Sequence, residues 1–359
     1  MRRIQFIGLA ILALVAACSQ EPGSQYTDQV LTNGRIYTVD QDRPWAEAVV
    51  IRDGHFVYVG DNAGAEAFAA EGAETTDLRG RLVIPGIVDA HTHPGQIDLT
   101  RYEARFEAGT RKAFMAELEA YAEQNPGDGW IRGCCWPVEE FVDGDKGPDR
   151  RDLDPIFPDR PVWLISTGGH SFWLNSLALA ELGIDEDSSD PQFPVAMYKR
   201  EESGRLTGWV KEGAAWVRVN DVFEVDREIH EASMREMLNT LSEYGVTTLF
   251  DAGTKGFADR VYAFLSKLDK AGELPLRYEA SYRISIPQYA PLAISEMKRY
   301  REAYGGDRLR FNTIKLFMDG IHENRSGAML EAYADDPDYE SDTILSVDEL
   351  RDFLLELNE

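Results

Sequence analysis

The sequence predicts an α/β fold in which helices cover a parallel sheet that follows a small β region. The first observation is a regular alternation of strands and helices over residues 229–317, which is typical of parallel α/β sheets. The second is a series of short alternating strands with turn signals over residues 29–82. The third is His91-Thr92-His93, which follows a predicted strand at 82–88. Residues two apart in a strand share a face, so both imidazoles point the same way.

The first eighteen residues are typical of an export signal. Arg2 and Arg3 precede an apolar run at 4–15 that is too short to span a bilayer. Residues 14–18, Leu-Val-Ala-Ala-Cys, resemble a bacterial lipobox, in which Cys18 carries the lipid. The alternative is an ordinary signal peptide with an incidental cysteine.

A short tether follows at residues 19–28, and Ser19 resembles the pattern of lipoproteins sent to the outer membrane. We therefore expect an exported cell-envelope lipoprotein, in the outer membrane or facing the periplasm. No second long apolar stretch exists, so the lipid would be its sole membrane attachment.

The composition disfavours a nucleic-acid partner. Lys and Arg number 37 against 63 Asp and Glu, which gives a net charge of −26. Such a surface repels phosphate backbones and anionic lipid.

The three cysteines do not indicate a disulfide scaffold. Besides Cys18 they are the neighbours Cys134 and Cys135. Adjacent residues rarely satisfy disulfide geometry, so we expect these two to be packed thiols.

A small β domain is predicted at residues 29–81. Strands at 30–39, 48–51 and 56–59 are separated by glycine-containing turns such as Asn33-Gly34. His55 lies in one of these turns, where we expect a solvated or packing histidine.

An insertion without tidy alternation is predicted at residues 95–225. It contains a helix near 112–123 and a strand at 162–166. A long insertion of this kind usually forms a lid or a substrate-binding subdomain.

The regular alternation follows the insertion. It comprises helices near 229–241, 261–270 and 294–304 and strands at 246–250, 276–284 and 311–317, and Gly245 ends the first helix. His230, between acidic neighbours, is expected to face solvent. Ser346 and Glu349 form a capping box that begins a last amphipathic helix.

These motifs resemble the amidohydrolase superfamily, and more closely its branch related to N-substituted formamide deformylase. The resemblance covers residue 29 to the last residue. It is carried by Leu31–Thr38, Arg52-Asp53-Gly54, the His91/His93 segment, Gly168–Ser171 with Asn175-Ser176, and Lys315–Gly320.

The resemblance implies a TIM-like (β/α)8 barrel of the metal-dependent hydrolase type with a small N-terminal β-sandwich-like domain. It also implies a long insertion after the first barrel strand. Only four barrel strands are found, at 82–88, 246–250, 276–284 and 311–317, so we expect residues 82–359 to hold about half of a barrel.

The same resemblance implies one or two divalent metal ions, zinc being the expected one, bound by His91 and His93. Lys315 would carry a CO2-derived carbamate that bridges two metals, or else would be a lysine paired with Asp319 or another carboxylate. Glu212 is the alternative acidic ligand. Asp89 precedes the first histidine and is expected to pack or to support the ligands and not to bind the metal itself.

Four further residues are candidates for substrate binding. His170 and Asn175 either donate hydrogen bonds to a substrate amide or stabilise a local turn. Asp319 and Arg325 either contact the substrate or a water at the metal, or form loop salt bridges. Both alternatives stay open for each pair.

The expected function is metal-assisted hydrolysis of a non-peptide C–N bond in a small-molecule N-substituted amide or formamide. Alternatives are another amidohydrolase activity, such as N-acyl-amino-acid deacylation or cyclic-amide hydrolysis, and a non-catalytic surface lipoprotein that acts as a binding module. In the resembling family the catalytic Asp and further His ligands come from later strands, so we expect these 359 residues alone to be inactive. The sequence leaves the oligomeric state open.

Overall fold

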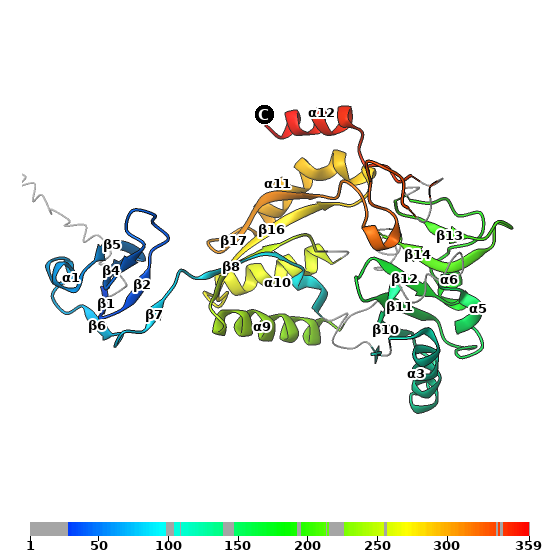
Figure 1. Cartoon of the computed structure of the whole chain (residues 1–359), viewed down its shortest axis with the longest axis horizontal. Coiled ribbons are helices and arrows are strands. Elements are labelled where there is room, and N and C mark those ends of the chain that lie inside the picture. Colours follow the sequence, from blue (N-terminus) through cyan, green and yellow to red (C-terminus); the bar gives the residue numbers. More distant parts are fainter. Residues whose placement is uncertain are drawn as a thin grey trace, which may run out of the picture. The chain divides into compact units, whose positions relative to one another are not determined.

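The computed structural model describes residues 28–97, 104–107, 109–138, 147–191, 195–212, 214, 226–254, 257–334, 337 and 340–358 (Figure 1). The chain divides into two compact units, Met1–Pro85 and Gly86–Glu359. The predicted lipidation site, Cys18, lies outside the described residues. Among the described helices, none combines the length and the apolar character that a membrane span requires.

The first unit contains two small sheets. One has the order β5-β4-β1-β6 and the other β3-β2-β7. Helix α1 buries Ala65 against Val30, Ala48 and Val50. His55 is exposed, as predicted, but it begins β5 directly after the turn at Asp53 and Gly54, with its Nδ1 2.9 Å from the Asp53 carbonyl oxygen. The elements are β1 (Gln29–Thr32), β2 (Arg35–Tyr37), β3 (Trp45–Ala46), β4 (Ala48–Arg52), β5 (His55–Gly60), α1 (Asn62–Phe68), β6 (Glu74–Asp77) and β7 (Leu82–Val83).

The predicted strand at 82–88 is wrong in its extent. Leu82–Val83 forms β7, which pairs in parallel with β2 of the first unit. The strand that carries the histidine pair is β8, Ile87–Thr92, in the second unit. Pro85 lies between them, and a proline has no backbone N–H with which to continue a strand ladder.

The second unit contains a parallel sheet with the strand order β17-β16-β15-β8, which confirms the predicted parallel α/β arrangement. The later strands are β15 (Val246–Asp251), β16 (Arg277–Ile284) and β17 (Leu309–Leu316). Within the described residues β8 and β17 each pair with one strand, and Val88 on β8 is 61% exposed.

One face of this sheet is covered by the helices α9 (Arg227–Glu243), α10 (Ala258–Lys270) and α11 (Ala293–Tyr304). Their apolar side chains, such as Leu238 and Leu265, pack against Leu249 and Tyr278 of the strands. Every third or fourth residue of these helices is apolar, so each buries one stripe.

The prediction that His230 faces solvent is wrong. Its side chain is 1% exposed, and its ring lies 6.5 Å from that of Phe257. The acidic neighbours Glu228 and Glu231 suggested a solvated face, but His230 lies on the buried side of α9, where Ser233 and Met234 are also buried.

The insertion is more regular than predicted. Its strands form a mixed sheet of order β13-β14-β12-β11-β10-β9, with Trp136, Trp163 and Trp173 fully buried. All four residues of β12 are buried, so no alternation of polar and apolar residues marks it. The elements are β9 (Ala104–Arg105), α3 (Arg111–Gln124), β10 (Ile131–Trp136), α5 (Arg150–Leu153), β11 (Val162–Ser166), β12 (Ser171–Leu174), α6 (Ser176–Glu181), β13 (Tyr198–Arg200) and β14 (Leu206–Lys211).

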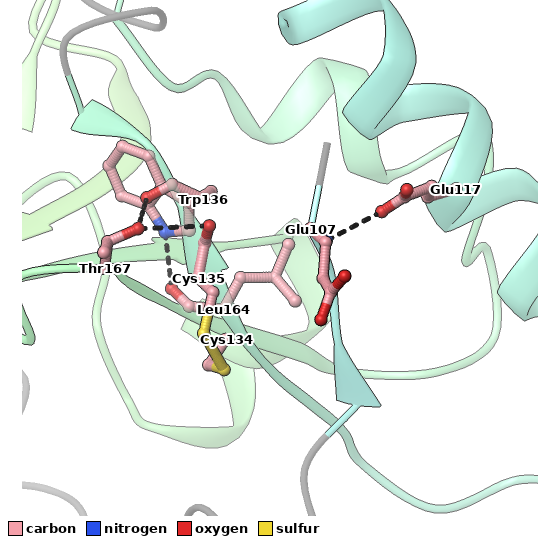
Figure 2. The surroundings of a disulfide bond; sticks show 7 residues. All are labelled: Glu107, Glu117, Cys134, Cys135, Trp136, Leu164 and Thr167. Carbon is pink, nitrogen blue, oxygen red and sulfur yellow. Dashed lines mark hydrogen bonds between the residues drawn. A yellow bond between two sulfur atoms is a disulfide. The ribbon is translucent and has the colours of Figure 1, made fainter. Parts of the chain in front are cut away.

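Cys134 and Cys135 form a disulfide, so the expectation of packed thiols is wrong (Figure 2). The pair lies near the end of β10, at a bulge where the register with β11 shifts between Cys134 and Trp136. Cys135 has a φ of 86°, in the left-handed region. That conformation brings two adjacent sulfur atoms together, which an ordinary extended strand does not do.

The last described helix is α12, Val347–Leu357, and it begins as predicted. Ser346 Oγ accepts from Glu349 N at 3.3 Å, and the Glu349 carboxylate accepts from Ser346 N at 2.8 Å. Phe353 packs with Ile284 and Ala293, next to the carboxyl end of β16.

Candidate active site

The imidazole pair lies at the carboxyl end of β8. The ring centroids of His91 and His93 are 5.4 Å apart. His91 is exposed, and its backbone N–H donates to Asp89 Oδ1 at 3.1 Å. Asp89 therefore stabilises the backbone of its own strand end.

His93 is oriented by the loop after β15. Its Nδ1 lies 3.2 Å from the carbonyl oxygen of Gly253. A carbonyl oxygen can only accept, so this contact assigns the proton to Nδ1 and the lone pair to Nε2. Metal-binding histidines commonly have this arrangement.

Asp251 holds the Gly253 loop in place. Its Oδ1 accepts from Gly253 N at 3.0 Å, and its Oδ2 accepts from Thr254 Oγ1 at 2.7 Å and from Tyr278 OH at 3.0 Å. Complete burial raises the pKa of Asp251 to about 6, and these hydrogen bonds only partly offset the burial. The sequence analysis did not single out Asp251. The feature that could have revealed it is an acidic residue at the end of an apolar strand.

The described residues offer only part of a metal site. No group of three His, Cys, Asp or Glu side chains suited to a metal ion occurs in the described ranges. A zinc ion usually takes about four ligands. The two imidazoles therefore fit a metal ion by their chemistry and the tautomer of His93, as a partial set of ligands.

Lys315 lies near the carboxyl end of β17, the edge strand opposite β8, with β15 and β16 between them. The neighbouring Ile314 and Leu316 pack toward Ala293 and Phe353, so Lys315 points to the other face of the sheet. Its Nζ lies 4.8 Å from the centroid of the Phe317 ring. The described structure thus places Lys315 and the histidine pair at the same end of one sheet but on separate strands.

Arg283 is the register partner of Lys315 on β16 and was not predicted. Its Cζ lies 4.5 Å from the centroid of the same Phe317 ring. Burial lowers the pKa of Arg283 to about 10, so the guanidinium is still charged at neutral pH. The feature of the sequence that could have drawn attention to Arg283 is its position near the end of a predicted strand.

Glu212 joins the insertion to the loop after β17. It is 7% exposed, and its Oε1 accepts from Ser326 Oγ at 2.6 Å and Asn324 Nδ2 at 3.0 Å. Its Oε2 is 2.6 Å from His170 Nδ1. Burial alone would raise the pKa of Glu212, but the hydrogen bond from His170 and the other donors lower it overall. With its oxygens engaged in this way, Glu212 is disfavoured as a metal ligand.

The substrate-binding prediction for Asn175 is wrong, and the local alternative is right. Its buried Oδ1 accepts from Val162 N and Ala178 N, both at 2.9 Å. Its Nδ2 donates to the carbonyl oxygens of Arg160 and Phe157. The side chain caps α6 and has no hydrogen-bonding capacity left for a substrate.

The other two candidates lie in the loop after β17. Asp319 Oδ2 accepts from Ala328 N at 3.0 Å. Arg325, with a φ of 54°, ends the short helix His322–Asn324. The loop that holds both is the one that Ser326 and Asn324 attach to Glu212.

The protein combines a parallel sheet with an imidazole pair at the carboxyl ends of the strands. It therefore belongs to the class of α/β proteins whose active sites lie at that end of the sheet. Residues 74–357 match the profile of the amidohydrolase family, and the chain belongs to this family.

Individual relatives agree with this membership. The exoenzymes regulatory protein AepA of Pectobacterium carotovorum subsp. carotovorum is 30% identical over 319 residues, which cover 86% of this chain and 67% of that protein. The N-substituted formamide deformylase of Arthrobacter pascens is 27% identical over 266 residues, or 70% of this chain and 47% of the enzyme. The chain thus spans about half to two thirds of the length of these relatives.

The fold also matches a solved structure. The crystal structure of an uncharacterised metal-dependent hydrolase from Pyrococcus horikoshii OT3 has a TM-score of 0.64 and 22% identity, and the match covers 92% of this chain and 63% of that one. Together with the family match over residues 74–357, this shows that the α/β architecture described above is of the amidohydrolase type.

Proposed function

We propose that this protein is a metal-dependent hydrolase of C–N bonds other than peptide bonds, acting on an N-substituted amide or formamide. The observation that carries the proposal is the contact of His93 Nδ1 with the Gly253 carbonyl, which presents Nε2 in its metal-binding form. Membership of the amidohydrolase family and the name of the deformylase relative support the same reaction class.

His91 and His93 would hold a divalent ion, zinc being the ion we propose. When bound, such an ion polarises the scissile carbonyl and lowers the pKa of water to about 7. The Gly253 carbonyl keeps the imidazole of His93 in one tautomer throughout, and the exposure of His91 leaves the pair accessible from solvent.

Lys315 would take part as a carbamate. Its neutral amine adds to the carbon of CO2, forming an N–C bond and releasing one proton, and the product is anionic. The carbamate form of Lys315 is an anion and could bind a metal ion, whereas its ammonium form could not. The neighbouring Arg283 would compensate the new negative charge if the two side chains turn toward each other.

His170 would bind the substrate. Because its Nδ1 faces the carboxylate of Glu212, Nε2 is the atom that the ring offers to an amide. Asp319 and Arg325, on the loop that Glu212 anchors, would complete the contacts to the substrate.

The test uses the protein expressed from its complete reading frame and loaded with zinc. Formate release from a panel of N-substituted formamides, together with elemental analysis, should show turnover and at least one metal ion per chain. A His91→Ala/His93→Ala double variant should lose both, whereas His55→Ala, which alters the exposed start of β5 in the other unit, should retain both.

The outcomes separate the alternatives. Undiminished metal in the double variant would refute the assignment of the ligands. Metal binding without turnover of any amide would favour a non-catalytic binding module, and turnover of cyclic amides instead of formamides would favour that related activity.

We also propose that the protein is an exported lipoprotein modified at Cys18. The support is the charged start, the short apolar run and the lipobox-like residues 14–18. Expressed in a bacterial host, the protein should fractionate with membranes, and Cys18→Ala should release it. Soluble cytoplasmic wild-type protein with an intact Met1 would contradict this proposal.

A further inference from the structure

The disulfide between Cys134 and Cys135 is poorly suited to act as a structural staple. A disulfide stabilises a fold mainly by closing a long loop in the unfolded chain, and a bond between neighbours closes almost none. Cys134 is buried, whereas Cys135 is half-buried, so the Cys135 side of the bond is the one open to a small thiol from solvent. These features favour a role in redox chemistry over a role in stability.

The bond holds the backbone of β10 in an unusual conformation. Cys135 has a φ of 86°, which side chains other than glycine rarely adopt. It is the extra residue of a bulge, because Cys134 pairs with Ile165 and Trp136 with Ser166. In an ordinary strand, adjacent side chains point to opposite faces. Reduction of the bond would therefore allow Cys135 to return to the extended conformation.

The bulge is tied to the end of the next strand (Figure 2). Thr167 donates from its backbone N to the Trp136 carbonyl oxygen at 3.0 Å. Its Oγ1 donates to the Cys135 carbonyl oxygen at 3.2 Å, with the Trp136 carbonyl oxygen at 3.4 Å. Trp136 is fully buried, and its Nε1 donates to the Leu164 carbonyl oxygen at 3.1 Å. Because Trp136 is fixed in this way, a rotation of the Cys135 backbone would fall on its own carbonyl and on Thr167.

Thr167 begins the turn that leads to His170. Gly168 and Gly169 form this turn, and a Cβ on either glycine would meet nothing within 4 Å in the part of the chain that the structure describes. The turn therefore has room to move. On its other side His170 is held by Glu212, whose Oε2 lies 2.6 Å from Nδ1 and whose backbone N donates to the His170 carbonyl oxygen at 2.8 Å. The disulfide thus acts on one of two supports of the imidazole.

We propose that the Cys134–Cys135 bond is a redox-sensitive switch that sets the position of His170. The oxidised pair holds the turn at 167–169, and the reduced pair releases the Cys135 carbonyl and lets the turn shift. The inference rests on the proposed function for the role of His170 in binding the substrate, whereas the structural change does not depend on catalysis. In the oxidising compartment that the proposed export implies, the bonded state would be the usual one.

The reductant is a small dithiol. One of its thiolates attacks the Cys135 sulfur, the S–S bond breaks, and Cys134 leaves as a thiolate that takes up a proton. The second thiol of the reductant then displaces Cys135 from the mixed disulfide. The pair gains two electrons and two protons, and the dithiol is oxidised to a disulfide.

The test uses the full chain with Cys18→Ser, so that Cys134 and Cys135 are its remaining cysteines. Dithiothreitol should convert the native, metal-free protein from no titratable thiol to two. Hydrogen exchange at the amides of Thr167 and Gly169 should then become about three- to tenfold faster, as expected when a hydrogen bond is lost. The amides of β16, in the other sheet, should exchange as before.

The imidazole of His170 gives a second measurement. Nitrogen-15 NMR, with the signal assigned by its loss in His170→Gln, should show a shift of this ring on reduction. The ring of His55, exposed in the first unit, should not shift. Thr167→Val removes the exposed hydroxyl that contacts the Cys135 carbonyl, and it should diminish the His170 shift without preventing reduction.

A Cys134→Ser/Cys135→Ser variant should resemble the reduced protein and should not respond to dithiothreitol. A response that persists in this variant would overturn the proposal. So would a bond that excess dithiothreitol does not reduce in the native protein, or a reduction to two thiols that leaves the turn and the His170 signal unchanged. Cooperative unfolding on reduction would also overturn it, because the bond would then be a structural support.

A kinetic arm separates this proposal from the proposed function. It uses zinc-loaded protein from which the reductant has been removed in the absence of oxygen. Reduction should raise KM for an N-substituted formamide about three- to tenfold and change kcat little, since one contact to the substrate is displaced. A His170 shift on reduction without turnover in either state would refute the proposed function and support the switch. Turnover with the same KM in both states would overturn the switch.

Discussion

The Nδ1 atom of His93 lies 3.2 Å from the carbonyl oxygen of Gly253, and this contact links two parallel strands at their carboxyl ends. β8 supplies the histidine, and the loop after β15 supplies the carbonyl. The orientation of a proposed metal ligand is therefore decided by a residue 160 positions away in the chain.

Gly253→Ala should weaken metal binding about 10- to 100-fold, the usual effect of losing a group that orients a ligand. Gly253 has a φ of 107°, and a Cβ there would collide with Arg283. Metal competition titrations would measure the change. Gly272→Ala is the control, because Gly272 also has a positive φ but nothing within 4 Å of its Cβ position. Equal affinity in the two variants would contradict the proposed role of the Gly253 carbonyl.

Lys315→Ala should remove a carbamate signal. Carbon-13 NMR of the zinc-loaded protein in labelled bicarbonate should show a carbamate carbon in the wild type and none in the variant. Short carboxylates should restore part of the lost activity. Lys267→Ala, on the exposed side of α10, should leave the signal intact. A wild-type spectrum without the carbamate carbon would mean that Lys315 is an unmodified lysine with an ordinary ammonium group.

Glu212→Gln should loosen the loop at 319–328. One carboxylate oxygen becomes an amide nitrogen, which cannot accept, so either Ser326 and Asn324 at Oε1 or His170 at Oε2 would lose its acceptor. Leaving buried donors unsatisfied costs about 1–3 kcal/mol. Hydrogen exchange should show faster exchange of this loop, with the exposed Glu202→Gln as control. Unchanged protection would mean that other contacts hold the loop.

Asp149 should make stability depend on acid pH. Burial raises its pKa, but hydrogen bonds from Arg151 and Arg205 outweigh burial and lower the pKa to about 2. A pKa that is lower in the folded state contributes stability above about pH 4, and this contribution disappears as the pH falls toward 2. The shift corresponds to about 2 kcal/mol.

Urea unfolding should therefore find Asp149→Asn destabilised by about that amount at pH 6 and by little near pH 2. Asp159→Asn, at an exposed position of the same region, should differ little from wild type at either pH. A deficit of Asp149→Asn that stays constant between the two pH values would show that the ion pairs do not stabilise the fold.

The Cys134–Cys135 disulfide predicts a definite thiol count. In a Cys18→Ser variant, which removes the remaining cysteine, the denatured and unreduced protein should give no thiol signal. After reduction, two thiols should titrate. Two thiols before reduction would instead support the packed thiols that the sequence suggested.

The sequence by itself determined the parallel sheet, the helices that cover it and the position of His91 and His93 at a strand end. These features follow from local periodicity and from turn and cap residues, which act over a few positions, as the Ser346 capping box shows. The predicted strand starting at residue 82 failed at Pro85, where a pairing with β2 of the first unit was invisible to a local pattern.

Only the tertiary structure decided which side chains meet. The partners of His93, Glu212 and Arg283 come from segments far away in the chain, and no local pattern predicts such contacts. It also decided burial: Asn175 and His230 occupy positions that local patterns assign to a site or to solvent, yet packing encloses both. The physical reason is that hydrogen bonding and desolvation depend on what surrounds a group in space. The periodicity of a sequence indicates only the face of its own helix or strand on which a side chain lies.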